Sequence, residues 1–219
     1  MDATFWHQKW QSSQIGFHLP EINPLLTRYW QQVCQSSRAP VFVPLCGKSV
    51  DMSYLASLGH NVIGCELSQL AVEQFFQEQQ LPFHMAEMTT GLRCYQAESI
   101  SLYQGDMFIL DSDKTAMCSL FYDRAALIAW PEQMRQRYVR KLMEMVPAGA
   151  RGLLITLDYP QDSLQGPPFA VSDAWLQQHL CDGFEITQLS CDDVLAANPR
   201  FVKRQVPWLT ESAYLLVRR

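Results

Sequence analysis

Short apolar runs alternate with longer amphipathic stretches along the chain, and this order predicts strands separated by helices. The predicted strands are residues 41–45, 61–66, 92–98, 100–103, 115–122, 151–158, 184–189 and 213–217. The predicted helices, in which apolar side chains recur every three or four positions, are residues 51–58, 70–80, 131–145 and 172–180.

The repeated strand–helix order predicts an α/β fold, a doubly wound and mostly parallel sheet with helices on both faces. The last two strands have little but loop between them, which predicts an antiparallel edge. No repeat or linker interrupts residues 1–219, so we expect a single domain. Residues 1–35 are expected to form an N-terminal helical lid segment, and the Gly/Pro-rich loop 163–168 is expected to form another part of the lid.

Composition and charge restrict the classes of partner. Hydrophobic residues make up 48% of the chain and charged residues 18%, a balance typical of globular proteins. The 17 Lys and Arg against 22 Asp and Glu give a net charge of −5, which argues against a protein that must neutralise nucleic-acid phosphates. No apolar run approaches the roughly 20 residues that span a membrane, and the N-terminus lacks the pattern of a secretory signal peptide.

The cysteines and histidines predict neither a disulfide framework nor a metal site. The seven cysteines are spread singly, without a Cys-x-x-Cys pair, and the five histidines show no ligand spacing. Because unpaired cysteines are typical of a reducing compartment, we expect a cytoplasmic protein. We also expect a monomer that binds a small molecule, not a nucleic acid or a membrane, and that needs no metal.

Three predicted strand ends carry candidate ligand-binding residues, since doubly wound sheets bind ligands at the carboxyl ends of their strands. Gly47 follows the first strand, where the backbone can approach a ligand closely, and Asp106 follows the strand at 100–103. Glu66 ends the second strand roughly 20 residues after Gly47, a position from which a carboxylate can accept hydrogen bonds from both ribose hydroxyls. The alternative interpretations are that Gly47 is an ordinary turn glycine and that Glu66 is a solvated residue at the end of its strand.

Two phosphate-binding motifs are excluded by the loop around Gly47. A dinucleotide fingerprint needs the three glycines of G-x-G-x-x-G, and this loop has one. Residues 47–49 (Gly-Lys-Ser) match the end of a P-loop, but Phe42 occupies the position of its first glycine. The remaining interpretation is a ligand with a ribose and no demanding phosphate group, a description that S-adenosylmethionine fits.

Aromatic residues near the N-terminus suggest what could cover such a ligand. Trp6 and Trp10 are four positions apart and share one face if the segment is helical. An indole ring attracts a cation, including a sulfonium, by roughly 0.5–2 kcal/mol. The alternative is that both rings simply pack against the core.

Five segments of the sequence resemble the thiopurine S-methyltransferase family, and in particular its bacterial members. The segments are 5–10 (FWHQKW), 15–18 (IGFH), 41–49 (VFVPLCGKS), 64–68 (GCELS) and 122–127 (YDRAAL). The resemblance runs the length of the chain. It implies methyl transfer from S-adenosylmethionine to the sulfur of aromatic or heterocyclic thiols such as thiopurines, with selenium and tellurium species as further candidates. It also implies a seven-stranded, Rossmann-like methyltransferase sheet.

The resemblance further implies roles for individual residues. Asp106 and Met107 are implied beside the adenine of the methyl donor, and Phe17 beside the acceptor. Arg124 is implied on both sides of the reaction. The residues implied to contact the donor, together with the loop glycine, are Trp10, Leu45, Gly47, Glu66, Asp106, Met107 and Arg124.

Arg124 is the candidate for holding the acceptor thiolate, because its guanidinium stays charged and can bond to an anionic sulfur. A plain salt bridge with Asp123 is the alternative. No general base is predicted, since an aromatic heterocyclic thiol gives up its proton readily, and no paired base would make Cys46 a nucleophile. Two other classes stay open: a nicotinamide-dependent oxidoreductase on the same sheet, and a binding protein without catalytic activity.

Overall fold

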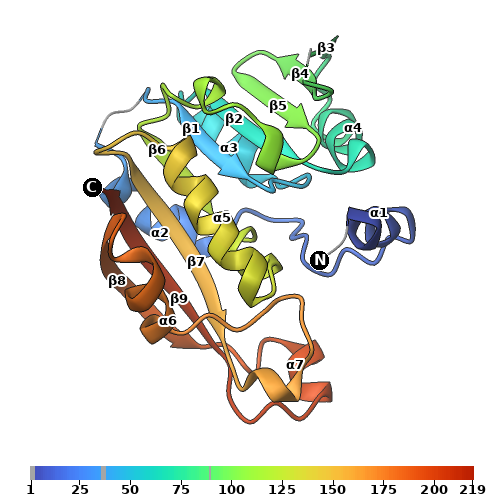
Figure 1. Ribbon diagram of the computed structural model, residues 1–219. Helices are drawn as coiled ribbons and strands as arrows, with labels where there is room; N and C mark the ends of the chain where they lie inside the picture. The colour runs from blue at the N-terminus through green and yellow to red at the C-terminus, as the bar shows by residue number, and fades with distance from the viewer. Residues whose placement is uncertain (1–2, 36–37, 89) are drawn as a thin grey trace.

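One mixed sheet of nine strands organises the part of the chain that the computed structural model describes, residues 3–35, 38–88 and 90–219. The strands are β1 (Val41–Pro44), β2 (Val62–Glu66), β3 (His84–Glu87), β4 (Arg93–Ala97), β5 (Ile100–Gln104), β6 (Leu120–Asp123), β7 (Arg151–Asp158), β8 (Phe184–Asp193) and β9 (Thr210–Arg218). Their order across the sheet is β3-β4-β5-β2-β1-β6-β7-β9-β8 (Figure 1). The five central strands, β5-β2-β1-β6-β7, are parallel, and the pairs outside them are antiparallel.

This topology confirms the α/β class and the mostly parallel sheet. The seven strands that the family resemblance implies are too few, as are the eight that the apolar pattern predicts, and the single antiparallel edge is wrong. The structure has nine strands in the described residues, and both edges are antiparallel. The sequence did not reveal β3 because all four of its residues are exposed, so no alternation of apolar positions marks it. The run 115–122 is strand only from Leu120, because the side chain of Asp111 caps a 3-10 turn at Ser112–Lys114 just before it.

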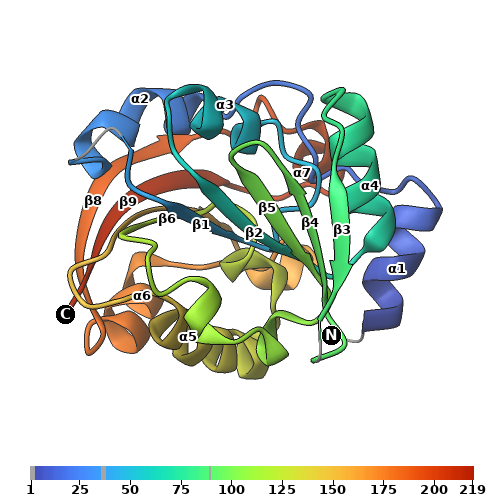
Figure 2. The same ribbon diagram turned by 90° about the horizontal axis from the view of Figure 1, so that it is seen from above.

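Helices cover both faces of the sheet, as the strand–helix order predicted. They are α1 (Ala3–Gln11), α2 (Pro24–Val33), α3 (Asp51–Ser57), α4 (Gln69–Glu78), α5 (Glu132–Met145), α6 (Asp173–Leu180) and α7 (Pro199–Lys203). Seen from above in Figure 2, α2, α3 and α4 lie on one face, and α5 and α6 lie on the other. Side-chain caps fix three of their starts: Asn23 for α2, Ser68 for α4 and Ser172 for α6.

Two hydrophobic clusters, one on each face, hold the sheet rigid. Leu26 and Phe75, from α2 and α4, belong to the first cluster and have no exposed surface. Tyr138 and Leu176, from α5 and α6, belong to the second. Burying a large apolar side chain contributes about 1.5–3 kcal/mol. The clusters therefore keep the carboxyl ends of the parallel strands in fixed positions.

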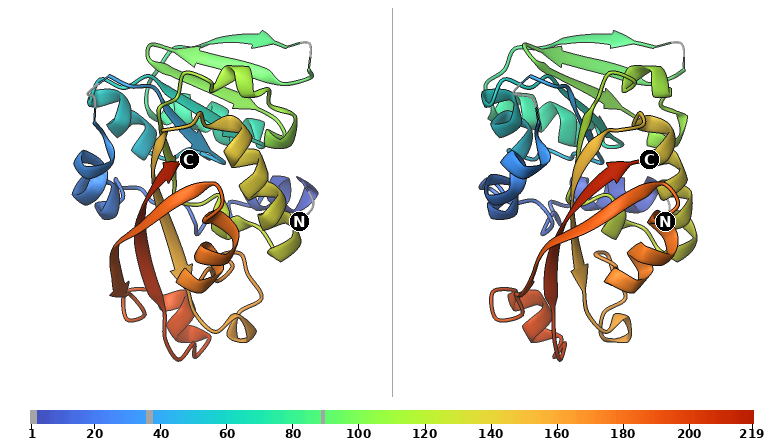
Figure 3. Two further views of the ribbon diagram at one scale, coloured as in Figure 1. Left: turned by 60° about the vertical axis from the view of Figure 1, so that its left-hand side comes forward. Right: turned by 90° about the vertical axis from the view of Figure 1, so that its left-hand side faces the viewer.

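Two segments lie outside this layered core. Helix α1 lies beyond the layers in Figures 1 and 3, and it contacts α4. Residues 1 and 2 of the expected lid segment lie outside the described residues. The long β8–β9 hairpin, orange to dark red in Figure 3, extends past the central strands and carries α7 at its far end. Among the described helices, none combines the length and the hydropathy needed to cross a membrane.

Candidate functional site

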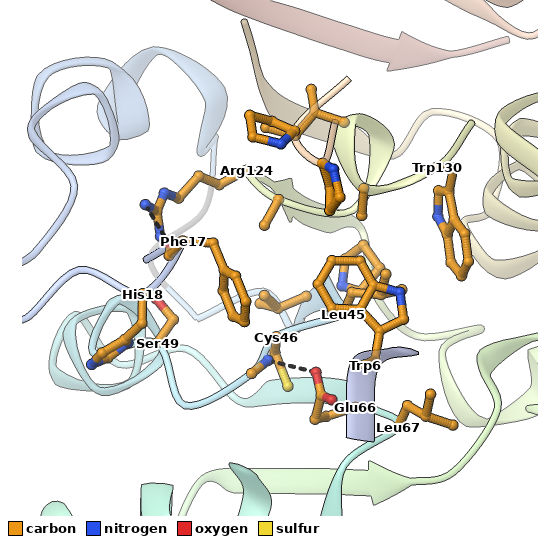
Figure 4. A pocket seen from close by; sticks show the side chains of 18 of the residues that line it. Trp6, Phe17, His18, Leu45, Cys46, Ser49, Glu66, Leu67, Arg124 and Trp130 are labelled. Carbon is orange, nitrogen blue, oxygen red and sulfur yellow. Dashed lines mark hydrogen bonds between the residues drawn. The ribbon is translucent and has the colours of Figure 1, made fainter. Parts of the chain in front are cut away.

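A cavity of about 440 Å³ lies at the carboxyl ends of the parallel strands. This volume is in the range of about 300–1,000 Å³ that small-molecule sites occupy. All eight residues predicted from the sequence line the cavity, although they come from six separate segments of the chain. They are Trp10, Phe17, Leu45, Gly47, Glu66, Asp106, Met107 and Arg124. Figure 4 labels four of them, Phe17, Leu45, Glu66 and Arg124.

The loop after β1 has an unusual backbone that brings it close to α1. Leu45 (φ 46°) and Gly47 (φ 54°) both adopt the left-handed conformation, which costs a residue with a side chain about 1–2 kcal/mol. A Cβ atom on Gly47 would lie 3.3 Å from atom Cζ2 of Trp10. Trp10 is 4% exposed. The indole ring therefore occupies the space that a side chain at position 47 would take.

Glu66 is buried, with 7% of its surface exposed, which rules out the solvated strand end. Its Oε2 accepts a hydrogen bond from the backbone amide of Gly47 at 2.9 Å, and its Oε1 accepts one from the amide of Ser68 at 2.8 Å. Burial raises the pKa of this carboxyl, and the hydrogen bonds from the backbone oppose that rise. Each oxygen retains acceptor capacity for a ligand hydroxyl. Figure 4 shows the carboxylate at the cavity wall.

Asp106 and Met107 lie at the end of β5, two strands from β1. One oxygen of Asp106 accepts a hydrogen bond from the amide of Phe108 at 2.9 Å and so caps the short 3-10 helix Met107–Ile109. Met107 is buried, whereas Asp106 is exposed. A neighbouring aromatic pair extends this side of the cavity, with the rings of Phe108 and Trp130 5.6 Å apart. This end offers both an apolar surface and a carboxylate to a flat base.

Aromatic rings from the N-terminal segment close another side of the cavity. Trp6 and Trp10 meet Phe17 edge to face, at 5.7 and 5.5 Å between ring centroids. The buried indole nitrogens of Trp6 and Trp130 have no hydrogen-bond partner among the described residues. An unpartnered buried donor costs about 1–3 kcal/mol. Two such donors in the wall of one cavity fit a ligand that carries acceptor atoms.

Arg124 is engaged with the lid segment and not with Asp123. Its Nη2 donates a hydrogen bond to the backbone carbonyl of Phe17 at 3.2 Å, drawn as a dashed line in Figure 4. Asp123 instead accepts from the hydroxyl of Tyr138 at 2.5 Å and from the amides of Ala126 and Leu127. No ion pair joins Arg124 to Asp123 in the described part of the chain. The alternative of a plain salt bridge is therefore wrong.

Other residues line the cavity without having been predicted as site residues. Arg200 belongs to α7, Glu211 to β9, and Trp130 follows a 3-10 turn. The loop 163–168, expected to be part of a lid, contributes Pro167 and Pro168. No motif in the sequence marks Arg200, Glu211 or Trp130. The first two reach the cavity through the β8–β9 hairpin region, and Trp130 reaches it through the turn between β6 and α5.

Metal and cysteine chemistry find no support at the site. The described residues contain no group of three or more His, Cys, Asp or Glu side chains that could hold a metal ion. Cys46 and Cys65 both line the cavity, but burial raises the pKa of each thiol well above its ordinary value. Both cysteines therefore stay protonated, as expected of small buried side chains.

Solved structures resemble this fold along almost the entire chain. An S-adenosylmethionine-dependent methyltransferase from Anabaena variabilis superposes with a TM-score of 0.66 at 14% identity, covering 99% of this chain and 95% of that one. One from Methanosarcina mazei has a TM-score of 0.61 at 14% identity and covers 90% of this chain and 98% of its own. At these identities the likeness shows a Rossmann-like methyltransferase fold.

Sequence comparison gives the family. The family model for thiopurine S-methyltransferase matches residues 1–219. Curated proteins named thiopurine S-methyltransferase from Shewanella sp. (strain MR-4) and Shewanella oneidensis are each 58% identical to the chain, and one from Shewanella pealeana is 55% identical. Each of these matches covers 100% of both sequences. The chain therefore belongs to the thiopurine S-methyltransferase family.

Proposed function

We propose that this protein transfers the methyl group of S-adenosylmethionine to the sulfur of aromatic and heterocyclic thiols, thiopurines among them. The observation that carries the proposal is Glu66, a buried carboxylate that two backbone amides fix at the rim of a cavity with aromatic walls. The relatives named for this reaction support the choice of acceptor class. The absence of a glycine-rich fingerprint in the loop after β1 speaks against a nicotinamide-dependent oxidoreductase.

The residues around Glu66 fit the parts of the methyl donor. The carboxylate suits the two ribose hydroxyls, and the surface at Asp106 and Met107 suits the adenine. The indole faces of Trp6 and Trp10 suit the sulfonium, because an aromatic face attracts a cation. Trp10 and the Gly47 loop it covers would exclude water from the donor.

The chain contributes alignment and electrostatics to the transfer itself. The reaction is an in-line displacement, so holding the two sulfurs and the methyl carbon in line supplies a large part of the acceleration. Phe17 lines the cavity next to Arg124, whose positive charge would stabilise an anionic acceptor sulfur. Excluding water strengthens that interaction.

The lid, the assembly and the compartment are part of the same proposal. Residues 1–219 act as one methyltransferase domain in which the N-terminal segment, up to residue 35, opens to admit the donor and closes over it. Trp6 and Trp10 contact Phe17, and all three rings belong to this segment. These contacts would keep the segment together as one unit when it opens and closes. None of the seven cysteines forms a disulfide, which supports a reducing compartment, the cytoplasm, and we propose that the protein works there as a monomer.

A methyl-transfer assay with labelled S-adenosylmethionine tests the function. Aromatic thiols, thiopurines, and selenium and tellurium compounds serve as acceptors, and the labelled product is identified. We expect turnover with aromatic thiols without added metal. Binding of S-adenosylhomocysteine without turnover of any thiol would instead indicate a binding protein, and binding of NAD in its place would indicate an oxidoreductase.

A further inference from the structure

Glu211 is an acidic side chain in the cavity that none of the roles above uses. It is the second residue of β9 and pairs with Leu157 near the end of β7. Because β9 runs antiparallel to β7, the first residues of β9 lie beside the last residues of β7, at the same end of the sheet as the carboxyl ends of the parallel strands. The hairpin that contains β9 can be followed in Figure 3.

The order of the strands places Glu211 away from the donor-binding residues. Gly47, Glu66 and Asp106 follow or end β1, β2 and β5, on one side of the sheet order. Arg124 follows β6, and Glu211 lies on β9, on the opposite side of β1. If the donor lies across β5, β2 and β1, Glu211 and Arg124 face the acceptor.

Glu211 and Arg124 influence each other without pairing. Burial raises the pKa of Glu211, and the positive charge of Arg124 opposes that rise. Among the ion pairs and side-chain hydrogen bonds of the described residues, none involves the Glu211 carboxylate, and the guanidinium of Arg124 is bonded to the carbonyl of Phe17. A cation and a free carboxylate thus line the same end of one cavity. A molecule with an electron-rich atom beside a polar N–H group would satisfy both.

We propose that Glu211 is the general base of the reaction and accepts the ring N–H proton of heterocyclic acceptors that bind as thiones, with the N–H group beside the C=S bond. This role rests on the proposed function and deepens it, because it names the acceptor class that the site selects. Arg124 faces the sulfur of such an acceptor, and Glu211 faces its ring nitrogen.

The transfer then balances without any further reactant. The acceptor sulfur forms a bond to the methyl carbon while the bond from that carbon to the donor sulfur breaks, and the donor leaves as a neutral thioether. The electron pair of the N–H bond forms a C=N bond as the C=S bond becomes a single C–S bond. The proton moves to an oxygen of Glu211, which releases it to solvent when the product leaves.

A carboxylate with a raised pKa suits this role, because a base acts best when its pKa lies nearer the working pH. Burial is the main cause of the raised pKa, and neighbouring charges modify it. Asp192, paired with Glu211 on β8, raises it, and Arg124 lowers it. Further titratable or charged groups on the elements around Glu211 include Tyr122 on β6, Asp158 on β7, Cys191 and Asp193 on β8, and Arg200 and Lys203 on α7.

Two acceptors and one substitution test the proposal. The acceptor 2-mercaptopyridine carries a ring N–H beside C=S in its thione form, whereas thiophenol has no ring nitrogen. We expect Glu211→Gln to lower kcat/KM for 2-mercaptopyridine by about 100-fold, the usual effect of losing a general base, and to leave thiophenol nearly unchanged. The fall of kcat/KM at low pH with 2-mercaptopyridine should disappear in the variant.

Binding and stability measurements separate a catalytic role from a structural one. Calorimetry of 2-mercaptopyridine with the protein bound to S-adenosylhomocysteine should show similar affinities for wild type and Glu211→Gln. Glu185→Gln is the matched control, because it removes an exposed carboxylate at the other end of β8 that does not line the cavity, and it should keep both activities. Should Glu211→Gln unfold, Glu211→Asp can replace it, because it keeps a carboxylate on a shorter side chain. This variant should still lower kcat/KM for 2-mercaptopyridine more than kcat/KM for thiophenol.

Three outcomes would overturn the role. An equal fall of kcat/KM with both acceptors in Glu211→Gln would mean that Glu211 only supports Arg124. An unchanged kcat/KM with both acceptors would mean that Glu211 takes no part in the chemistry. Wild-type protein that methylates neither thiol would contradict the proposed function itself and this role with it.

Discussion

The indole ring of Trp10 lies over Gly47 so closely that a Cβ atom at position 47 would be 3.3 Å from atom Cζ2 of the ring. The amide of the same glycine donates a hydrogen bond to Glu66. Helix α1, the loop after β1 and the end of β2 are therefore linked through one residue. A substitution at Gly47 should therefore disturb the packing of α1, the conformation of the loop and the hydrogen bond to Glu66.

The first prediction follows from this link. Gly47→Ala introduces a side chain at a positive φ, which costs about 1–2 kcal/mol, and it also pushes against Trp10. We expect the affinity for S-adenosylhomocysteine, measured by calorimetry, to fall about tenfold, the equivalent of 1.4 kcal/mol. Gly149→Ala is the matched control, since Gly149 also has a positive φ but a Cβ atom there would meet no described atom within 4 Å. The control should lose stability and keep its affinity; equal affinity losses in both variants would contradict the link.

A second prediction concerns the carboxylate of Glu66. Glu66→Ala removes the acceptor for two backbone amides and for the ribose hydroxyls. Donor binding should weaken by about 1–3 kcal/mol, the range for losing hydrogen bonds to a charged group. Glu66→Gln should lose less, because its side chain still offers one oxygen. Unchanged affinity of the alanine variant in calorimetry would remove Glu66 from the ribose site.

Three residues of the candidate site could be predicted because they follow strands whose apolar pattern is clear, whereas the family resemblance implied Trp10, Phe17, Leu45, Met107 and Arg124. Gly47, Glu66 and Asp106 sit at such strand ends, and a parallel sheet brings these ends together. Glu211 and Arg200 could not be found in this way. They reach the cavity through the antiparallel hairpin and a short helix, and no spacing in the sequence relates them to the parallel strands.

The fold could be predicted for the same reason, and the prediction failed where a strand is exposed and no run of apolar residues marks it. The strands at 41–45, 61–66 and 151–158 are almost entirely buried, so continuous apolar runs mark them. Strand β3 is exposed throughout and pairs only at an edge, where pairing depends on the backbone rather than on its side chains. Its existence follows from the hairpin that β4 and β5 form beside it.

The third prediction concerns the lid. Residues 5–18 should exchange amide hydrogens quickly without ligand and slowly with S-adenosylhomocysteine, because the segment must open to admit the donor. Helix α4, whose apolar face is buried in the core, serves as the internal control and should exchange slowly in both states. Similar protection of residues 5–18 in both states would favour the alternative in which Trp6 and Trp10 are packing residues.

Asp123 leads to a prediction about stability and pH. Burial raises the pKa of its carboxyl to about 6, although three hydrogen bonds oppose that rise. Between about pH 4, the ordinary value, and pH 6, the folded protein keeps this proton while the unfolded chain loses it. The contribution of Asp123 to stability is therefore complete below pH 4 and decreases as the pH rises to 6.

Asp123→Asn removes this dependence, because the amide does not titrate. Urea unfolding of both proteins from pH 4 to pH 7 should show wild type losing stability relative to the variant by roughly 2–3 kcal/mol, about 1.4 kcal/mol for each pKa unit. A constant difference between the two proteins across this range would mean that the carboxyl of Asp123 titrates normally in the fold.

The last prediction separates the charge of Arg124 from its shape. Arg124→Lys keeps the positive charge but loses the forked donor geometry, whereas Arg124→Ala loses both, together with the bond to the carbonyl of Phe17. If the charge holds an anionic or electron-rich acceptor sulfur, turnover should fall partly in the lysine variant and further in the alanine variant. Varying each substrate in turn gives these losses as differences in transition-state free energy. If Arg124 only supports the donor site, both variants should mainly bind S-adenosylmethionine less tightly, and saturating donor should restore turnover. Because the guanidinium also ties down the lid at Phe17, some loss of donor affinity is expected in either case, and only the part of the loss that excess donor leaves unrepaired measures the role of Arg124 toward the acceptor.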